Sequence, residues 1–292
     1  MQLNREDEIR PFSFPVAARL IVLVVIVIGA IAFTTTLKPV PQPLTYHQFA
    51  DARPMFEIPR ASDVLSNLPF VLVGIAGQVL CFGASRRFLH SDVLAAYATM
   101  FTGLLLTGFG SAYYHLAPDN YRLVWDRLPM TLVMAGFLSV LILDRTKLRA
   151  PWILPLLAVL GIGSVLNWRW SEVHGHGDLR WYALFQALAI LTGLLLLIMF
   201  RAKKPEGTGV LVIAISANVA AKIFELLDKP IYDLGGIVSG HTLKHLSAGL
   251  GFVPLLFWIA ARRRNALNAP AAEDLRCQPA TTSNVMPHGN IK

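Results

Sequence analysis

Long apolar runs recur along the whole chain and are separated by short polar stretches. A helix that crosses a bilayer needs roughly 20 mostly apolar residues, and eight runs come close to that length. They cover residues 18–36, 64–84, 92–115, 124–144, 150–167, 180–200, 208–227 and 240–261. The gaps between them leave no room for a separate soluble domain. The pattern therefore predicts an all-α fold, a polytopic membrane helix bundle with eight spans.

The composition supports the bilayer as the main solvent of this chain. Of the 292 residues, 54% are hydrophobic and 15% are charged, and the mean hydropathy of +0.53 lies outside the range of soluble globular domains. The pI is near 9.7, but the basic residues are spread over loops, which argues against a nucleic-acid partner. Two cysteines are too few for a disulfide framework or a thiolate metal site.

The two ends of the chain differ from the main group of spans. The run at 18–36 is either an extra transmembrane helix or a cleaved signal segment, since Ala30 and Ala32 match the small residues of a cleavage site. Either alternative leaves the orientation of the later helices unchanged. Residues 265–292 are rich in Ala, Pro, Asn and Thr without apolar periodicity, which predicts a disordered tail.

Lysine and arginine are concentrated in alternate loops. The stretches "ASRRF", "DRTKLRA", "RAKKPEG" and "ARRRN" carry 2, 3, 3 and 3 of these residues and share one side with the N-terminus in the eight-span scheme. The positive-inside rule makes that side cytoplasmic. We therefore expect residues 1–17 and the tail in the cytoplasm of a bacterial cell, the spans in its inner membrane, and the other loops facing outward.

Polar and ionisable residues gather near the outward ends of several predicted spans. Such groups are costly inside a bilayer and usually serve a site. In "SAYYH" and "HTLKH" the first and last residues are four positions apart, so each pair shares one helical face. We expect the three histidines of these motifs to converge at one membrane depth. The full set comprises Ser111, His115, Asp126, Glu225, His241, Lys244 and His245.

Three imidazoles from two helices suit zinc, and three protein ligands with an open fourth position are typical of a catalytic zinc site. We therefore predict His115, His241 and His245 as metal ligands. Asp126 is then the candidate base or orienting group for a water molecule, and Ser111 the candidate oxyanion donor. The alternative is that these are ordinary polar residues of the membrane interface.

These motifs resemble those of the alkaline ceramidase family. Its wider superfamily of seven-helix membrane proteins includes the adiponectin and progestin receptors and the haemolysin III group. The superfamily signature is S-x-x-x-H on the second core helix, an Asp opening the third and H-x-x-x-H on the seventh. The "SN" of Ser66 and Asn67 also looks like the ceramidase branch. The resemblance covers residues 57–261 and implies seven core transmembrane helices, with 18–36 as one extra N-terminal span.

The resemblance implies a zinc-dependent amidohydrolase acting on linear amides. In that family, metal-activated water attacks the amide carbonyl of a ceramide and releases a fatty acid and a sphingoid base. Ser111 would support the oxyanion and Asp126 the proton transfers. The substrate would be a membrane lipid, either ceramide-like or another N-acyl lipid, because one catalytic centre can serve lipids whose scissile bonds lie at similar depth.

One stretch departs from the family pattern. Eukaryotic members carry a dense acidic N-terminal cluster that binds calcium, an ion that takes 6–8 oxygen ligands. Here the corresponding stretch offers few carboxylates, and two cations interrupt them, so we do not expect calcium. The residues concerned are Asp51, Arg53, Glu57, Arg60 and Asp63.

Two other classes of function stay open at this point. One is a non-catalytic receptor or regulator with a structural zinc site; the other is a b-type haem protein that uses two of the histidines. The sequence also leaves open whether Glu225 and Lys222 pair beside a cavity or sit at the interface. Lys244 is most simply an interfacial anchor, and the glycine-separated histidines of "EVHGHG" predict a solvated loop rather than a second metal site.

Overall fold

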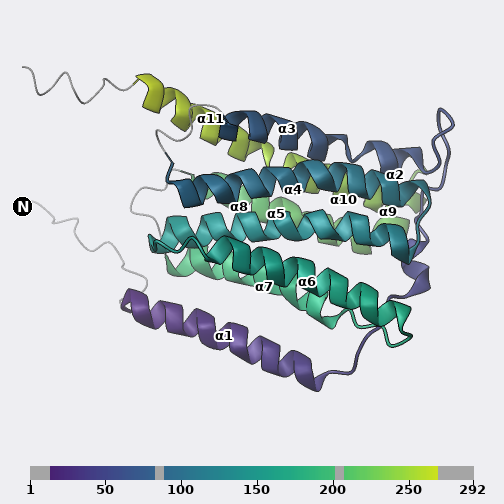
Figure 1. The fold of residues 1–292 in the computed structure, drawn as a ribbon. Coiled ribbons are helices and arrows are strands. Elements are labelled where there is room, and N and C mark those ends of the chain that lie inside the picture. The colour runs from purple at the N-terminus through teal and green to yellow at the C-terminus, as the bar shows by residue number, and fades with distance from the viewer. Residues whose placement is uncertain (1–13, 83–88, 201–206, 269–292) are drawn as a thin grey trace, which may run out of the picture.

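The computed structural model describes residues 14–82, 89–200 and 207–268. Within these ranges the chain is a bundle of α-helices without a β-strand, which confirms the predicted all-α class. The long helices run side by side (Figure 1). The α-helices, long and short, are α1 (Val16–Thr36), α2 (Ala61–Leu65), α3 (Leu68–Phe82), α4 (Ser91–Leu116), α5 (Asn120–Thr146), α6 (Ile153–Val173), α7 (Arg180–Met199), α8 (Thr208–Leu226), α9 (Asp228–Asp233), α10 (Gly240–Leu250) and α11 (Val253–Asn268).

Eight helical stretches are long and apolar enough to cross a membrane, as the pattern predicted. The pairs α2 with α3 and α10 with α11 each form one of these stretches. The protein is therefore an integral membrane protein by the length and composition of its helices. The start of α1 and the end of α11, in the first and last spans of the chain, lie at the same end of the bundle (Figure 1). An even number of crossings requires this arrangement.

The helix ends differ from the predicted ranges by several residues in places: α5 starts at Asn120 rather than 124, and α6 ends at Val173 rather than 167. The span expected to end at residue 261 continues as α11 to Asn268, so the first residues of the expected tail are helical. The same span is broken at Gly251 and Phe252, because Pro254 has no N–H to donate to the preceding turn. The remainder of the expected tail, 269–292, lies outside the described residues, as does most of the expected N-terminal segment.

The break between α2 and α3 has a side-chain cause. Ser66 Oγ donates to the carbonyl oxygen of Asp63 at 3.1 Å, and Asn67 Nδ2 donates to the same oxygen at 2.7 Å. Short polar side chains that bond to nearby carbonyls compete with the regular helical ladder. The "SN" pair therefore marks a real interruption, and it turns the Ser66 hydroxyl toward the interior of the bundle.

Helices α4 and α5 approach each other closely near the end of α4 and the start of α5. A Cβ atom at Gly110 would lie 2.8 Å from the carbonyl carbon of Trp125, and its carbonyl oxygen is nearer still. Only a residue without a side chain allows this contact between backbones. The close approach sets Ser111 of α4 against Asp126 of α5, two residues that the sequence had singled out.

The segment 37–60, which includes the short 3-10 helix η1 (Leu44–His47), crosses one end of the bundle (Figure 1). Its backbone forms hydrogen bonds to the bundle at two points. The carbonyl oxygen of Val40 accepts from Leu179 N at 2.8 Å, and Ala50 N donates to the side-chain oxygen Oδ2 of Asp228 at 2.9 Å. This segment therefore has a fixed position over the ends of α7 and α9, which lie at the histidine end of the molecule.

Within this segment, Asp51 is fully engaged by a neighbouring cation. Arg53 donates from Nε and Nη2 to the two carboxylate oxygens of Asp51, each at 2.8 Å. The guanidinium holds the pKa of Asp51 below its usual range. One of the three carboxylates in the stretch compared with a calcium site is thus already neutralised by an arginine.

Candidate metal centre

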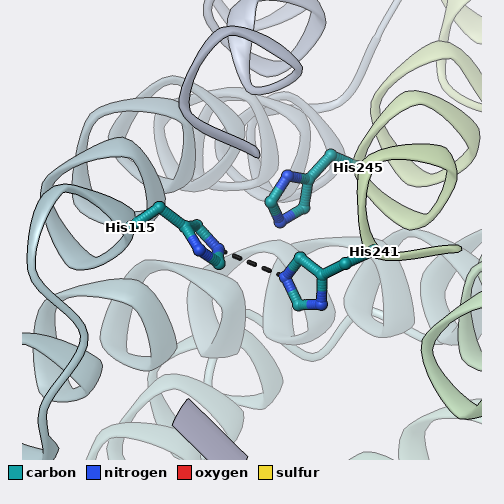
Figure 2. Close-up of side chains that lie close together, drawn as sticks. All are labelled: His115, His241 and His245. Atoms are coloured by element: carbon teal, nitrogen blue, oxygen red, sulfur yellow. Dashed lines mark hydrogen bonds between the residues drawn. The ribbon is translucent and has the colours of Figure 1, made fainter. Parts of the chain in front are cut away.

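Three buried histidines come together at the end of the bundle that the segment 37–60 crosses. His115 lies in the last turn of α4, and His241 and His245 lie in the first turns of α10. Their rings point toward one another (Figure 2), and each side chain offers one nitrogen within 4.8 Å of the others. The residues are 1%, 3% and 3% exposed. The structure thus brings together the three histidines that the motifs indicated.

The start of α10 is fixed by two oxygen acceptors. Ser239, the N-cap residue, accepts from Thr242 N at 3.0 Å, and Asp228 Oδ1 accepts from His241 N at 2.8 Å. Such caps satisfy N–H groups that a helix leaves free at its N-terminus. Because His245 follows His241 by one helical turn, fixing the first turn of α10 orients both imidazoles.

Ser66 determines which nitrogen of His245 faces the other rings. The Ser66 hydroxyl donates to the backbone carbonyl oxygen of Asp63, and its oxygen lies 2.9 Å from His245 Nδ1. With its hydrogen used in this way, the hydroxyl is an acceptor for a proton on Nδ1, and that tautomer leaves the lone pair of Nε2 for a metal ion. The sequence pointed to Ser66 only through a family resemblance and gave no indication of this contact.

Aromatic side chains surround the histidines. The ring of Phe49, from the crossing segment, lies 4.6 Å from the ring of His115 and 4.4 Å from that of His241, centre to centre. The ring of Tyr114 is 4.9 Å from that of His115. This apolar packing limits water around the imidazoles, which strengthens their interaction with a cation.

The donor set fits a small transition-metal ion. Zinc binds imidazole at about 2.0–2.1 Å, so two nitrogens on one tetrahedral ion lie about 3.3 Å apart. The Nε2 atoms of His115 and His241 are 3.2 Å apart. His115 Nδ1 is buried and has no hydrogen-bond partner in the described part of the chain, so only its Nε2 is engaged. The buried residues form a site that accepts any ion suited to imidazole nitrogen.

Ser111 and Asp126 line a cavity that also contains His245. The side chains of Ser111 and Asp126 are close enough to interact, and the two residues are 2% and 6% exposed. The cavity has a volume of about 290 Å³ and lies between α4, α5, α7, α8 and α10. A hydroxyl, a carboxylate and a histidine therefore meet in one wall of the cavity.

The rest of the cavity is mainly apolar. Its walls away from the polar end come from the middle of the bundle, where side chains of several helices face inward. They include Leu104, Val133, Phe137, Ile190, Ile215 and Phe252. The cavity therefore joins a polar end, beside the histidines, to a body that suits a hydrocarbon chain.

An ion-pair cluster forms another part of the polar end. Glu225 accepts from Lys222 Nζ at 2.7 Å and from Lys244 Nζ at 2.8 Å, and Tyr46 donates to it at 3.1 Å. The Lys222–Glu225 pair that the spacing allowed is present, and it faces the cavity. Lys244, which the sequence favoured as an interfacial anchor, instead points to Glu225 with its side chain only 15% exposed.

The "EVHGHG" stretch does not contribute to the candidate metal centre. His174 and His176 are exposed and pack beside the ring of Trp170. Glu172 accepts from Trp168 Nε1 at 3.1 Å and from Gln42 N at 2.5 Å. Its role in the structure is thus to hold the crossing segment.

No protein-family model matches this chain. The resemblance to the ceramidase superfamily therefore rests on the motifs themselves, and the chemistry has to be argued from the arrangement of the residues.

Proposed function

We propose that this protein is a zinc-dependent intramembrane hydrolase that cleaves the amide bond of a ceramide-like or other N-acyl lipid. One observation carries the proposal. Three buried imidazoles converge beside a cavity whose lining includes a neighbouring serine and aspartate at its polar end and is otherwise mainly apolar. Metal-dependent hydrolysis of a lipid needs metal ligands, proton-transfer groups and a space for the chain, and here these adjoin one another.

His115, His241 and His245 would hold the ion through nitrogen atoms that already face one another. A zinc ion with three histidine ligands supplies Lewis acidity and lowers the pKa of a water molecule to about 7. Ser66 orients His245, and Phe49 excludes solvent from the outward side of the other two imidazoles. These neighbours keep the ligand nitrogens in place.

Asp126 and Ser111 act on protons and on developing charge. The carboxylate of Asp126 accepts a proton from the attacking water and returns it to the leaving nitrogen of the amide, as a general base and then a general acid. The hydroxyl of Ser111, which lies beside Asp126, would donate its hydrogen to the carbonyl oxygen as negative charge builds there. Both side chains already line the cavity in which the amide would bind.

The cavity indicates the form of the substrate. Burying each methylene of an acyl chain against the apolar walls contributes about 0.8 kcal/mol relative to water. The lipid substrate would enter with its amide at the polar end and its chain toward the middle of the bundle. This places the scissile bond near one end of the spans rather than at the centre of the bilayer.

The basic loops support an orientation for the protein. Loops rich in lysine and arginine lie on the side of the N-terminus, and the positive-inside rule makes that side cytoplasmic. The candidate metal centre is at the opposite end of the spans, so its amide chemistry would occur near the outer leaflet. In a bacterium this is the periplasmic face of the inner membrane.

The direct test is fatty-acid release by the purified full chain in lipid vesicles. A panel of ceramides and other N-acyl lipids is incubated with the wild type, with His115→Ala and with His176→Ala, and products are measured by mass spectrometry. We expect release by the wild type and by His176→Ala, whose histidine is exposed and does not line the cavity, and background levels for His115→Ala. Full release by His115→Ala, or none by the wild type, would refute the proposal.

A further inference from the structure

Arg127 is a buried cation that hydrolysis by the groups above does not use. It follows Asp126 in α5, is 5% exposed and lines the cavity. A buried charge is costly unless it is paired and hydrogen-bonded. The partners of this guanidinium therefore indicate what else the cavity receives.

The protein satisfies Arg127 only in part. Its Nη2 donates to Gln42 Oε1 at 2.7 Å, whereas Nη1 is buried and has no hydrogen-bond partner in the described part of the chain. Its guanidinium carbon lies 4.3 Å from the ring centre of Trp168, 5.0 Å from that of Tyr182 and 5.5 Å from that of Tyr46. Aromatic faces stabilise a cation, but they leave its charge uncompensated.

No ion pair to Arg127 is found among the described residues, although carboxylates lie in the same cavity wall. Glu225 is engaged by Lys222 and Lys244, and Lys222 is half exposed, so water also reaches its charge. Arg127 lines the cavity without an ion-pair partner among the described residues, and its Nη1 is left without an acceptor. A negatively charged group on an occupant would supply that acceptor.

We propose that the occupant of this cavity carries an anionic group, a carboxylate or a phosphate, which binds Arg127 while the acyl chain fills the apolar body. Hydrogen bonds between a guanidinium and such an anion are strong because both partners are charged. If the occupant is also the substrate of the proposed hydrolase, a step that rests on the proposed function, the substrate is an N-acyl lipid whose amine half is acidic, such as an N-acyl amino acid. Ceramide itself, which is neutral, would then be a weaker ligand.

The test compares lipids that share one acyl chain. The purified full chain in neutral detergent is titrated with N-oleoylglycine, N-oleoylethanolamine and the O-phosphate of N-oleoylethanolamine, and Kd is measured by equilibrium dialysis. A charge-assisted contact predicts that at least one acidic lipid binds about tenfold or more tightly than the neutral one. The tighter of the two acids identifies the group. Equal affinity for all three lipids overturns the inference.

Two variants assign the preference to Arg127. Arg127→Gln should lower affinity for the acidic lipid about tenfold and leave affinity for the neutral lipid unchanged. The matched control is Arg122→Gln, on the same helix, where the arginine pairs with Asp119 outside the cavity lining. If Arg127→Gln does not fold, Arg127→Lys, which keeps the charge but loses the planar fork, should weaken the preference. An unchanged preference in the folded variant overturns the inference.

The binding measurement separates this inference from the proposed function. A preference for acidic lipids without any fatty-acid release would refute the hydrolase and leave the anion site standing. Release from neutral and acidic amides at equal rates, together with equal affinities, would support the hydrolase and refute the anion site.

Discussion

The contact between α4 and α5 at Gly110 gives the most specific structural prediction. Replacing this glycine by alanine adds one methyl group, which would lie 2.8 Å from the carbonyl carbon of Trp125 and closer to its oxygen. Ordinary contacts begin at 3.4 Å. Relieving the contact with the carbonyl carbon alone requires a separation of about 0.6 Å, and the nearer oxygen requires more. A backbone carbonyl cannot rotate away from the methyl group as a side chain would.

The expected effect combines two opposing contributions. Overpacking of this kind destabilises a fold by about 1–3 kcal/mol, and we expect the upper end because the obstacle is backbone. Alanine in a helix is about 1 kcal/mol more favourable than glycine. The net loss is therefore about 2 kcal/mol. Misplacing reacting groups by about 1 Å reduces rates about a hundredfold, so a shift of Ser111 from Asp126 by more than about 0.6 Å should reduce amide hydrolysis at least about tenfold.

Gly163→Ala is the matched control, because a Cβ atom at this position in α6 meets nothing within 4 Å. It should keep full activity and gain up to about 1 kcal/mol in the free energy of unfolding. Both variants are compared by denaturant unfolding in detergent micelles and by fatty-acid release. Activity and stability of Gly110→Ala equal to those of Gly163→Ala would show that the close approach does not hold Ser111 against Asp126.

Three further predictions test the neighbours of the site. Ser66→Ala removes the acceptor for His245 Nδ1 and should weaken zinc affinity about 10- to 100-fold; chelator competition measures this, and unchanged affinity would contradict it. Glu225→Gln leaves two lysines unpaired and should lower stability by about 3 kcal/mol, whereas Asp233→Asn, at an exposed pair, should change it by less than about 1 kcal/mol. Because the pKa of Asp51 is depressed, its contribution is present above the ordinary value of 3.8 and lost as pH falls through the folded value. The loss of thermal stability below pH 4 should therefore be smaller in Asp51→Asn, and an equal loss would refute the pairing.

The spans could be predicted because each apolar run is long enough to cross a bilayer by itself. Their interruptions could not, since they depend on local side-chain bonds such as those of Ser66 and Asn67 to one carbonyl oxygen. The break before α11 could have been predicted from Pro254, but the apolar run continues through it, and the prediction used the length of the run alone. Hydropathy therefore predicts the length of a membrane span better than it predicts breaks within the helix.

The histidines could be selected because each motif places two polar side chains one turn apart. That α4 meets α10 was an expectation drawn from equal depth and from family resemblance, since contacts between helices depend on packing along their whole length. The crossing segment was the least predictable part. Phe49 and Tyr46 show no periodicity, yet they contact the histidines and Glu225, because the turn η1 folds back over the bundle. Lys244 and Glu225, on different helices, likewise pair only through the fold.

The central claim is that three imidazoles hold one zinc ion, and metal analysis of purified protein tests it most directly. Wild type, His115→Ala and the exposed-loop variant His174→Ala are prepared in detergent, passed over a desalting column and analysed by elemental mass spectrometry. We predict about one zinc per chain in the wild type and in His174→Ala, and almost none in His115→Ala. A wild type without metal, or an equal zinc content in His115→Ala, would contradict the claim.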